Sequence, residues 1–220
     1  MKKAVIFDFD YTLGDSTEGI VKSTLSALER LGEKNTSKEE IKATVGISLD
    51  ETYKVLTGKD DDEKAKLFTK FFIEKADEVM VDSTELYEST LEVLSELKKI
   101  GFKTGIVTTK LNSRIQSILK KFNAEYLIDV IIGVENVKNV KPHPEGLEKA
   151  VKLLGLSKKE VLYVGDSYID ANAAQNANID FIGVLTGTTT NEKFSEFKNI
   201  TVCKDVEDAF NFVINNREEI

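Results

Sequence analysis

Two aspartates, Asp8 and Asp10, stand at the end of the first apolar run of the chain, residues 5–7. A short run of apolar, strand-favouring residues is typical of a strand that is buried on both faces. Because residues i and i+2 of a strand share a face, both carboxylates can point into one crevice. There they would repel each other unless a hard divalent cation such as Mg²⁺ bound their oxygens. One carboxylate could also attack phosphorus and form an aspartyl-phosphate. The plainer interpretation is a strand end with two solvated aspartates.

Polar groups that suit phosphate chemistry follow two later strands and begin one stiff loop. Thr108 ends an apolar run just before a helix, where its hydroxyl could bind an anion or simply cap the helix. Lys141 precedes the only two prolines of the chain, which stiffen its loop, and its ammonium group could neutralise phosphate charge. Asp166 and Asp170 follow a strongly apolar run, and a helix cap would explain one of them but not both.

These groups lie along a chain in which strand and helix patterns alternate. The expected strands cover residues 4–7, 103–108, 130–133, 161–164, 181–184 and 200–203. The expected helices between and after them cover residues 91–99, 113–122, 145–154, 171–176 and 210–215. This alternation predicts an α/β fold with a doubly wound, Rossmann-like parallel sheet. Ligands of such sheets bind just beyond the carboxyl ends of the strands, where the polar groups stand.

A long block without a convincing strand separates the first strand from the others. Residues 14–82 show helical periodicity, and Ser37 with Glu40 forms an expected capping box inside this block. The first strand has no sheet partner nearby in the sequence, so the block is best explained as an insertion. We therefore expect an α-helical cap domain, residues 14–82, inserted into an α/β core domain formed by residues 1–13 and 83–220.

The composition excludes several classes of protein. The 220 residues carry a net charge of −8, which argues against a nucleic-acid partner because such a surface needs a basic patch. The single cysteine, Cys203, excludes an intrachain disulfide and is interpreted as a small buried hydrophobe. No apolar run approaches the ~20 residues that span a bilayer, and the N-terminus does not resemble a signal peptide. We expect a cytoplasmic protein without a membrane partner; the sequence predicts no particular oligomeric state.

Taken together, the polar groups resemble the motifs of the haloacid dehalogenase superfamily of phosphohydrolases. The motifs stand in the family's order: Asp8-Phe9-Asp10-Tyr11-Thr12, Thr108, Lys141-Pro142 and Gly165-Asp166-Ser167-Tyr168-Ile169-Asp170. The resemblance covers nearly the whole chain, including a helical cap between the first two motifs. It looks like the subfamily that contains phosphoglycolate phosphatase and β-phosphoglucomutase, and it implies an α/β core with an inserted cap.

The resemblance implies four catalytic roles. Asp8 would be the nucleophile that takes the phosphoryl group, and Asp10 would be the acid for the leaving group and then the base for water. Thr108 would hydrogen-bond the phosphoryl oxygens, and Lys141 would hold both Asp8 and the phosphate. These roles agree with physical chemistry, because phosphoryl transfer needs positioning and neutralisation of the equatorial oxygens.

The resemblance also implies a Mg²⁺ cofactor. Its ligands would be Asp8, the backbone carbonyl of Asp10 and Asp166, with Asp170 supporting the ion directly or through water. One departure is Tyr11, which stands where many relatives have glycine. This departure affects only the expected detail of the turn.

Substrate contacts are expected from Thr109 and from the Gly46 and Ser48 loop of the cap, because relatives close a similar loop over the active site. In mutase relatives an arginine usually follows the serine of this loop, but here Leu49 follows Ser48. His143, the only histidine, is interpreted as a loop or surface residue without a catalytic role.

The expected function is therefore a Mg²⁺-dependent phosphatase that hydrolyses a small phosphorylated metabolite, similar to phosphoglycolate phosphatase. Within the same fold the alternatives are a phosphosugar mutase of the β-phosphoglucomutase type and an inorganic pyrophosphatase or nucleotidase. Outside this chemistry the alternatives are a receiver-like signalling module, which lacks a large helical insertion, and a binding protein that has lost catalysis.

Overall fold

The computed structural model describes residues 1–34, 36–197 and 200–216. The chain forms two compact units, one made of residues 1–14 and 86–220 and the other of residues 15–85. Each unit has its own hydrophobic core, and each is described here by itself.

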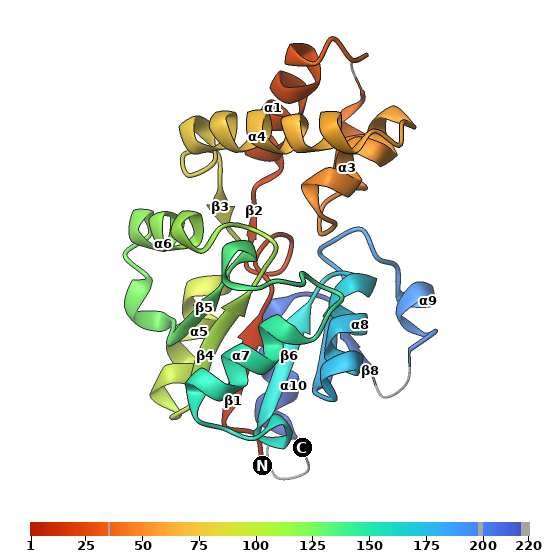
Figure 1. Cartoon of the computed structure of the whole chain (residues 1–220). Helices are drawn as coiled ribbons and strands as arrows, with labels where there is room; N and C mark the ends of the chain where they lie inside the picture. Colours follow the sequence, from red (N-terminus) through yellow and green to blue (C-terminus); the bar gives the residue numbers. More distant parts are fainter. Residues whose placement is uncertain (35, 198–199, 217–220) are drawn as a thin grey trace. The chain divides into compact units, whose positions relative to one another are not determined.

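A six-stranded parallel sheet with the order β5-β4-β1-β6-β7-β8 forms the centre of the first unit (Figure 1). Its strands are β1 (Ala4–Phe7), β4 (Lys103–Val107), β5 (Val130–Ile132), β6 (Val161–Gly165), β7 (Asp180–Val184) and β8 (Ile200–Cys203). All four residues of β1 are buried, as a strand covered on both faces requires. The predicted doubly wound α/β fold is confirmed.

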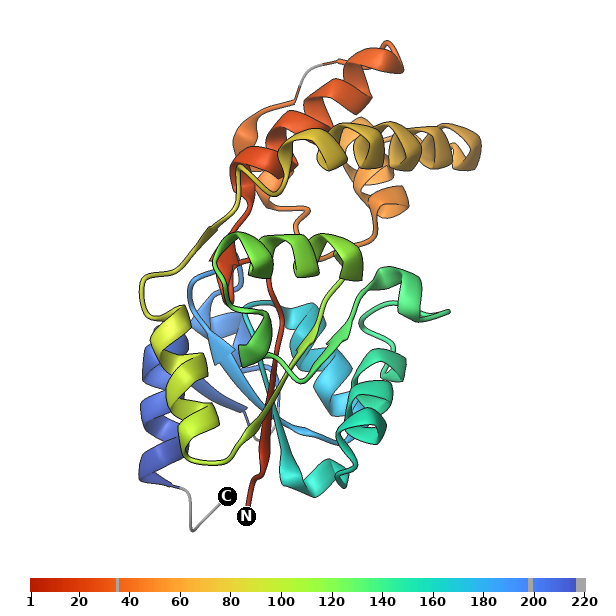
Figure 2. The same cartoon turned by 90° about the vertical axis from the view of Figure 1, so that its left-hand side faces the viewer.

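Helices cover both faces of this sheet (Figure 2). On one face lie α5 (Thr90–Lys99) and α10 (Val206–Asn215), which pack against each other. On the other face lie α7 (Glu145–Leu154) and α8 (Tyr168–Ala177). The unit also contains α6 (Asn112–Lys121) and several shorter elements: α9 (Asn191–Phe194) and the 3₁₀ turns η1 (Glu125–Leu127), η2 (Val134–Asn136) and η3 (Lys158–Glu160). The sequence had not predicted α9 or these 3₁₀ turns.

The register of β1 fixes where the first motif lies. Phe7 stands opposite Ile106 on β4 and opposite Val164 on β6. The amide of Asp8 still donates to the carbonyl of Val164 over 2.9 Å, so the strand pairing continues up to the first aspartate. The residues that follow β1, β4 and β6 therefore meet at one edge of the sheet, as expected for ligand sites in such folds.

The second unit is helical, with α1 (Thr17–Arg30), α2 (Lys38–Lys42), α3 (Leu49–Thr57) and α4 (Asp62–Val79). The predicted capping box is present, because Ser37 and Glu40 each accept a hydrogen bond from the other's amide. Phe68 packs its ring near those of Tyr53 and Phe72 in the core of this unit. The sequence had not predicted the short strands β2 (Gly14–Asp15) and β3 (Glu85–Leu86), which pair where the chain passes between the two units.

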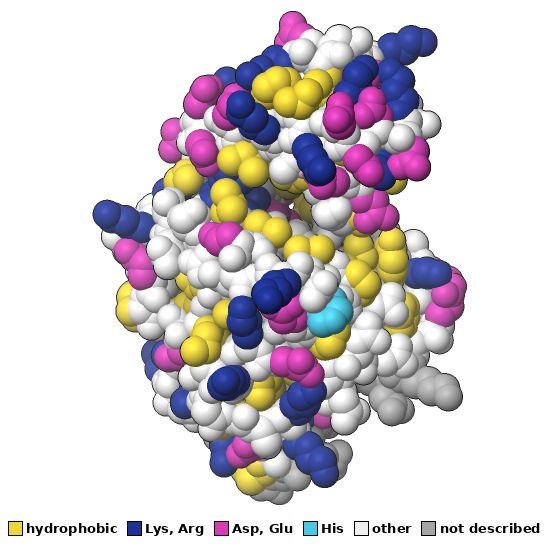
Figure 3. Space-filling model, viewed as in Figure 1, with side chains coloured by type: hydrophobic (Ala, Val, Ile, Leu, Met, Phe, Trp, Pro, Cys, Tyr) yellow, Lys and Arg dark blue, Asp and Glu magenta, His cyan; other side chains and the backbone are white. Residues whose placement is uncertain are grey.

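The surface carries charges of both signs. On the face drawn in Figure 3, acidic and basic side chains are interspersed. Within the described part of the chain, no helix combines the length and the apolar character that crossing a membrane requires. Cys203 is buried in β8, as interpreted from the sequence.

Candidate active site

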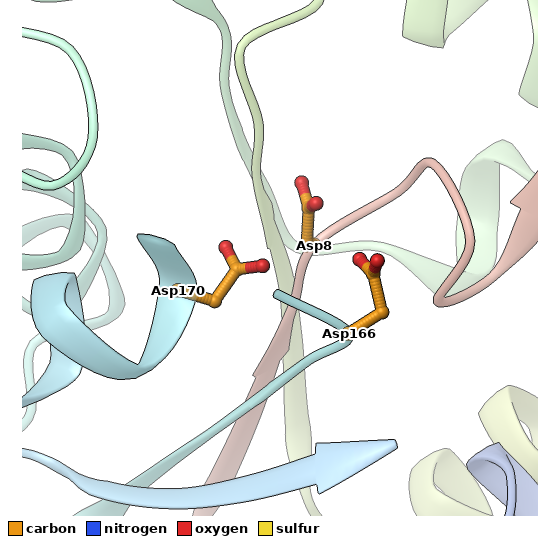
Figure 4. A group of neighbouring side chains, drawn as sticks. All are labelled: Asp8, Asp166 and Asp170. Carbon is orange, nitrogen blue, oxygen red and sulfur yellow. The ribbon is translucent and has the colours of Figure 1, made fainter. Parts of the chain in front are cut away.

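Three carboxylates converge beyond the ends of β1 and β6 (Figure 4). Asp8 follows β1, Asp166 follows β6, and Asp170 lies in the first turn of α8. One oxygen from each of these side chains lies within 4.8 Å of the other two, and all three residues are buried. The fold thus gathers residues from two distant motifs into one acidic cluster.

Lys141 supplies positive charge to this cluster. Its Nζ lies 2.9 Å from Oδ1 of Asp8 and 2.6 Å from Oδ1 of Asp170, and it donates to the hydroxyl of Tyr163 over 3.1 Å. The side chain of Lys141 is only 5% exposed, so these partners replace the water that an ammonium group normally requires. Lys141 is therefore fixed between the proposed nucleophile and Asp170, and it is no solvated loop lysine.

Asp170 uses both of its oxygens within the protein. Oδ1 accepts hydrogen bonds from Lys141 and from the hydroxyl of Tyr163, the latter over 2.7 Å. Oδ2 accepts from the amide and the hydroxyl of Ser167, and Ser167 in turn caps α8 through the amide of Asp170. This capping box accounts for Asp170 in part, whereas Asp166 lies outside it. The geometry supports the view that Asp170 acts on the site through Lys141.

A second buried lysine, which the sequence interpretation overlooked, accompanies Asp10. Nζ of Lys110 lies 3.1 Å from Oδ2 of Asp10, and the side chains are 5% and 12% exposed. The other oxygen of Asp10, Oδ1, is buried and has no hydrogen-bond partner within the described part of the chain. The signal was present in the sequence, because Lys110 is the last residue of a Thr-Thr-Lys run at the end of β4.

The threonines after β4 lie at the same edge of the sheet. Thr108 is buried, lines a small cavity together with Lys141, and accepts a hydrogen bond from the amide of Lys110 over 3.2 Å. It does not cap α6, whose first cap position is Leu111. Thr109 is half-buried. Its expected substrate contact stays a prediction.

The turn after Asp10 holds a residue in the left-handed region. Tyr11 has φ near 60°, a conformation that suits glycine and is uncommon for other residues. The next residue, Thr12, is fully buried, and its hydroxyl lies 3.4 Å from Oδ1 of Asp166. Tyr11 therefore adopts the left-handed conformation itself, and the turn connects the first motif to the fourth.

Burial controls the protonation of the acidic cluster. Burial, together with the charges of Asp170 and Asp10, raises the pKa of Asp8 from 3.8 to about 7, although Lys141 opposes this shift. Burial and the neighbouring charges of Asp170 and Asp8 likewise raise the pKa of Asp166 well above its usual value. Burial alone would lower the pKa of Lys141, but the adjacent carboxylates raise it, so the lysine stays charged.

The donor set fits a divalent cation. When all are ionised, the four carboxylates of Asp8, Asp10, Asp166 and Asp170 pair, among the residues that the structure describes, with two ammonium groups, those of Lys110 and Lys141. Two negative charges are left over, which is the charge that one hard divalent cation neutralises, and the donors are oxygens, which such cations prefer. Oδ1 of Asp8 meets the ammonium group of Lys141 at 2.9 Å and has no other partner among the described residues, so it retains a lone pair for a cation.

The remaining expected residues belong to the helical unit and to the loop before α7. Gly46 and Ser48 belong to the helical unit, where Ser48 caps α3 by accepting a hydrogen bond from the amide of Glu51 over 3.3 Å. Their expected substrate contacts stay predictions. His143 is exposed, and its Nδ1 accepts a hydrogen bond from the amide of Glu145, which agrees with the interpretation of a surface loop residue.

Comparison with known proteins places this geometry in a family. The sequence model described as "haloacid dehalogenase-like hydrolase" matches residues 5–184. Pyrophosphatase PpaX of Bacillus mycoides (strain KBAB4) is 35% identical over 180 residues, which cover 82% of each chain. A crystal structure from Bacteroides fragilis, described as a haloacid dehalogenase-like hydrolase, superposes with a TM-score of 0.90 at 39% identity and covers 93% of this chain and 98% of that one.

A crystal structure from Haemophilus somnus 129PT, described as a predicted phosphoglycolate phosphatase, superposes with a TM-score of 0.86 at 25% identity and covers 96% of this chain and 98% of that one. The similarity to these proteins extends over most of their lengths as well as most of this chain. The chain therefore belongs to the haloacid dehalogenase-like hydrolase family.

Proposed function

We propose that this hydrolase is a Mg²⁺-dependent phosphatase that cleaves a small phosphorylated metabolite through an aspartyl-phosphate on Asp8. The observation that carries the proposal is the position of the Asp8 carboxylate, which is buried at the end of β1 with the ammonium group of Lys141 at 2.9 Å. A carboxylate can attack phosphorus once its charge and the phosphoryl charge are balanced by fixed cations. Mg²⁺ held by Asp8, the Asp10 carbonyl and Asp166 would supply the additional positive charge.

In the first step an oxygen of Asp8 attacks phosphorus, the bond between phosphorus and the leaving oxygen breaks, and Asp10 gives its proton to that oxygen. In the second step a water molecule attacks phosphorus, Asp10 takes the proton of that water, and the bond to Asp8 breaks to release inorganic phosphate. Lys141 keeps the attacking carboxylate in place and neutralises the phosphoryl oxygens, while the hydroxyl of Thr108 can donate to them.

The substrate proposal remains at the level of a class. The names of the relatives suggest inorganic pyrophosphate and phosphoglycolate as the first compounds to test. Both carry a second negative charge close to the phosphoryl group that is transferred. A phosphosugar mutase is the weaker alternative, because Leu49 follows Ser48 where mutase relatives usually have arginine.

The decisive experiment measures phosphate release from a panel of phosphorylated metabolites, with and without Mg²⁺, by wild type and by Asp8→Asn. We expect Mg²⁺-dependent turnover by wild type and a phosphoryl adduct on Asp8 in acid-quenched protein by mass spectrometry. Asp8→Asn keeps the shape of the side chain and should be inactive, while Asp77→Asn, an exposed position on α4, should behave as wild type. Normal turnover by Asp8→Asn, in protein checked for deamidation, would refute the proposal.

A further inference from the structure

Residues 185–189, in the loop between β7 and α9, contact both motifs that contribute residues to the proposed metal site. The hydroxyl of Thr186 donates to the carbonyl of Tyr11, in the turn that follows Asp10. The hydroxyl of Thr189, which is buried, accepts a hydrogen bond from the amide of Tyr168 over 3.1 Å, at the start of α8. The loop thus joins the first and fourth motifs without supplying a charged group of its own.

Between these two anchors, the backbone of Gly187 lies directly against the carboxylate of Asp166. A Cβ atom added to Gly187 would be 1.8 Å from Oδ2 of Asp166 and 2.5 Å from its Cγ, distances that no side chain can adopt. The backbone of Gly187 is outside the left-handed region, so what the position requires is space. Any larger residue must displace either the loop or the carboxylate.

The Asp166 carboxylate is therefore confined from two directions. Thr12 donates to Oδ1 over a long 3.4 Å, an interaction too weak to fix the side chain by itself. The backbone of Gly187 leaves no space for the Asp166 side chain to rotate toward the loop that contains Gly187. Asp166 is only 4% exposed, so water does not replace either restraint.

We propose that Gly187, held in place by Thr186, is a positioning residue that aims the Asp166 carboxylate at a divalent cation shared with Asp8. The inference rests on the Mg²⁺ site of the proposed function and assigns cation affinity to a loop that contributes no ligand. The physical reason is that groups that orient a ligand typically change metal affinity by ~10–100-fold when they are lost.

The test measures cation binding in the absence of substrate, by calorimetric titration with Mg²⁺ and by the electron paramagnetic resonance signal of free Mn²⁺. Gly187→Ala should weaken binding of both ions roughly 10–100-fold. Thr186→Val, which removes the bond to the Tyr11 carbonyl but fills the same space, should weaken binding by a smaller factor. Thr188→Ala, an exposed residue of the same loop, should bind as wild type does.

Gly183→Ala is the matched control for a general loss of stability. The atoms nearest to its added Cβ all belong to the ring of Phe194, at 3.0–3.1 Å, so it should lower the melting temperature and leave cation affinity unchanged. The proposal is overturned if Gly187→Ala binds both ions as tightly as wild type, or if Gly183→Ala weakens binding equally. If Gly187→Ala does not fold, unchanged affinity in Thr186→Val overturns it.

These outcomes are separable from failure of the proposed function. A wild-type protein that binds Mg²⁺ but releases no phosphate from any compound refutes the phosphatase and leaves the role of Gly187 standing. A wild-type protein that binds neither Mg²⁺ nor Mn²⁺ refutes the role of Gly187.

Discussion

Without a cation, the protein should become less stable as the pH rises, because Asp8 is buried. Raising the pKa of Asp8 from 3.8 to about 7 means that the folded protein binds this proton more tightly than the unfolded chain does. The contribution of the Asp8 carboxyl group to the free energy of unfolding is therefore greatest at low pH, falls as the pH rises from about 4 to 7, and is constant above that. The whole difference corresponds to roughly 4 kcal/mol, of which about 2–3 kcal/mol should be lost between pH 5 and pH 8.

The assay is urea unfolding at several pH values in the presence of EDTA, for wild type and for Asp8→Asn. Asparagine does not titrate, so the free energy of unfolding of wild type minus that of Asp8→Asn isolates the carboxyl group together with its coupling to Asp166. This difference should fall by about 2–3 kcal/mol from pH 5 to pH 8. A difference that stays level or rises over this range would show that burial does not control the protonation of Asp8.

Saturating Mg²⁺ should reverse the trend, because the cation competes with protons for the same oxygens. In wild type, the stabilisation by Mg²⁺ should therefore increase from pH 5 to pH 8. In Asp8→Asn, Mg²⁺ should stabilise the protein much less at every pH, since one ligand has lost its charge. Equal stabilisation of the two proteins at pH 8 would exclude Asp8 as a ligand.

Five further variants test single contacts. Asp166→Asn should abolish activation by Mg²⁺, and Asp170→Asn should only weaken it, by ~10–100-fold. Both effects are measured by titrating the reaction rate against Mg²⁺. An Asp166 variant that responds to Mg²⁺ as wild type does would contradict the assignment of Asp166 as a metal ligand. Ser48→Asn, which preserves the helix cap, should change the relative activities toward different substrates, and an equal loss on every substrate would exclude the Gly46 and Ser48 loop as the determinant of specificity. Lys141→Met should lower the activity toward every substrate and should reduce the free energy of unfolding in urea by about 3–5 kcal/mol. Lys110→Met removes the ion pair that holds the Asp10 carboxylate. It should lower kcat/KM more for alkyl than for aryl phosphates, because poor leaving groups depend most on a well-placed acid. Equal losses on both kinds of substrate would argue against a role of Lys110 in positioning Asp10 as the acid.

Much of the fold followed from local patterns in the sequence. Gly32 and Gly155 each follow a run with helical periodicity, and both have the positive φ that ends a helix, so a local pattern can indicate where a helix stops. The strands were recognisable because a parallel sheet buried on both faces needs continuous apolar runs. The ends of these runs then placed Asp8 and Asp166 at one edge of the sheet.

The parts that were missed depend on contacts between distant segments. Tyr163 lies inside an apolar run, and only the sheet register and the path of the Lys141 loop bring its hydroxyl to the carboxylates. Lys110 differs from the many exposed lysines only through its burial beside Asp10. The capping role of Asp170 was the exception, because Ser167 three residues earlier is a local signal that the sequence did contain.

The central place of β1 in the sheet has a consequence for biosynthesis. β1 leaves the ribosome before its two neighbours in the sheet, which begin only at Lys103 and Val161. The helical unit, residues 15–85, is continuous and has its own core, so it can fold while β1 still lacks a partner. Asp8 and Asp10 therefore remain in water until β6 has been made. They become buried only when most of the sheet can assemble around them. A nascent chain stalled before β6 would carry a folded helical unit and would lack the acidic cluster.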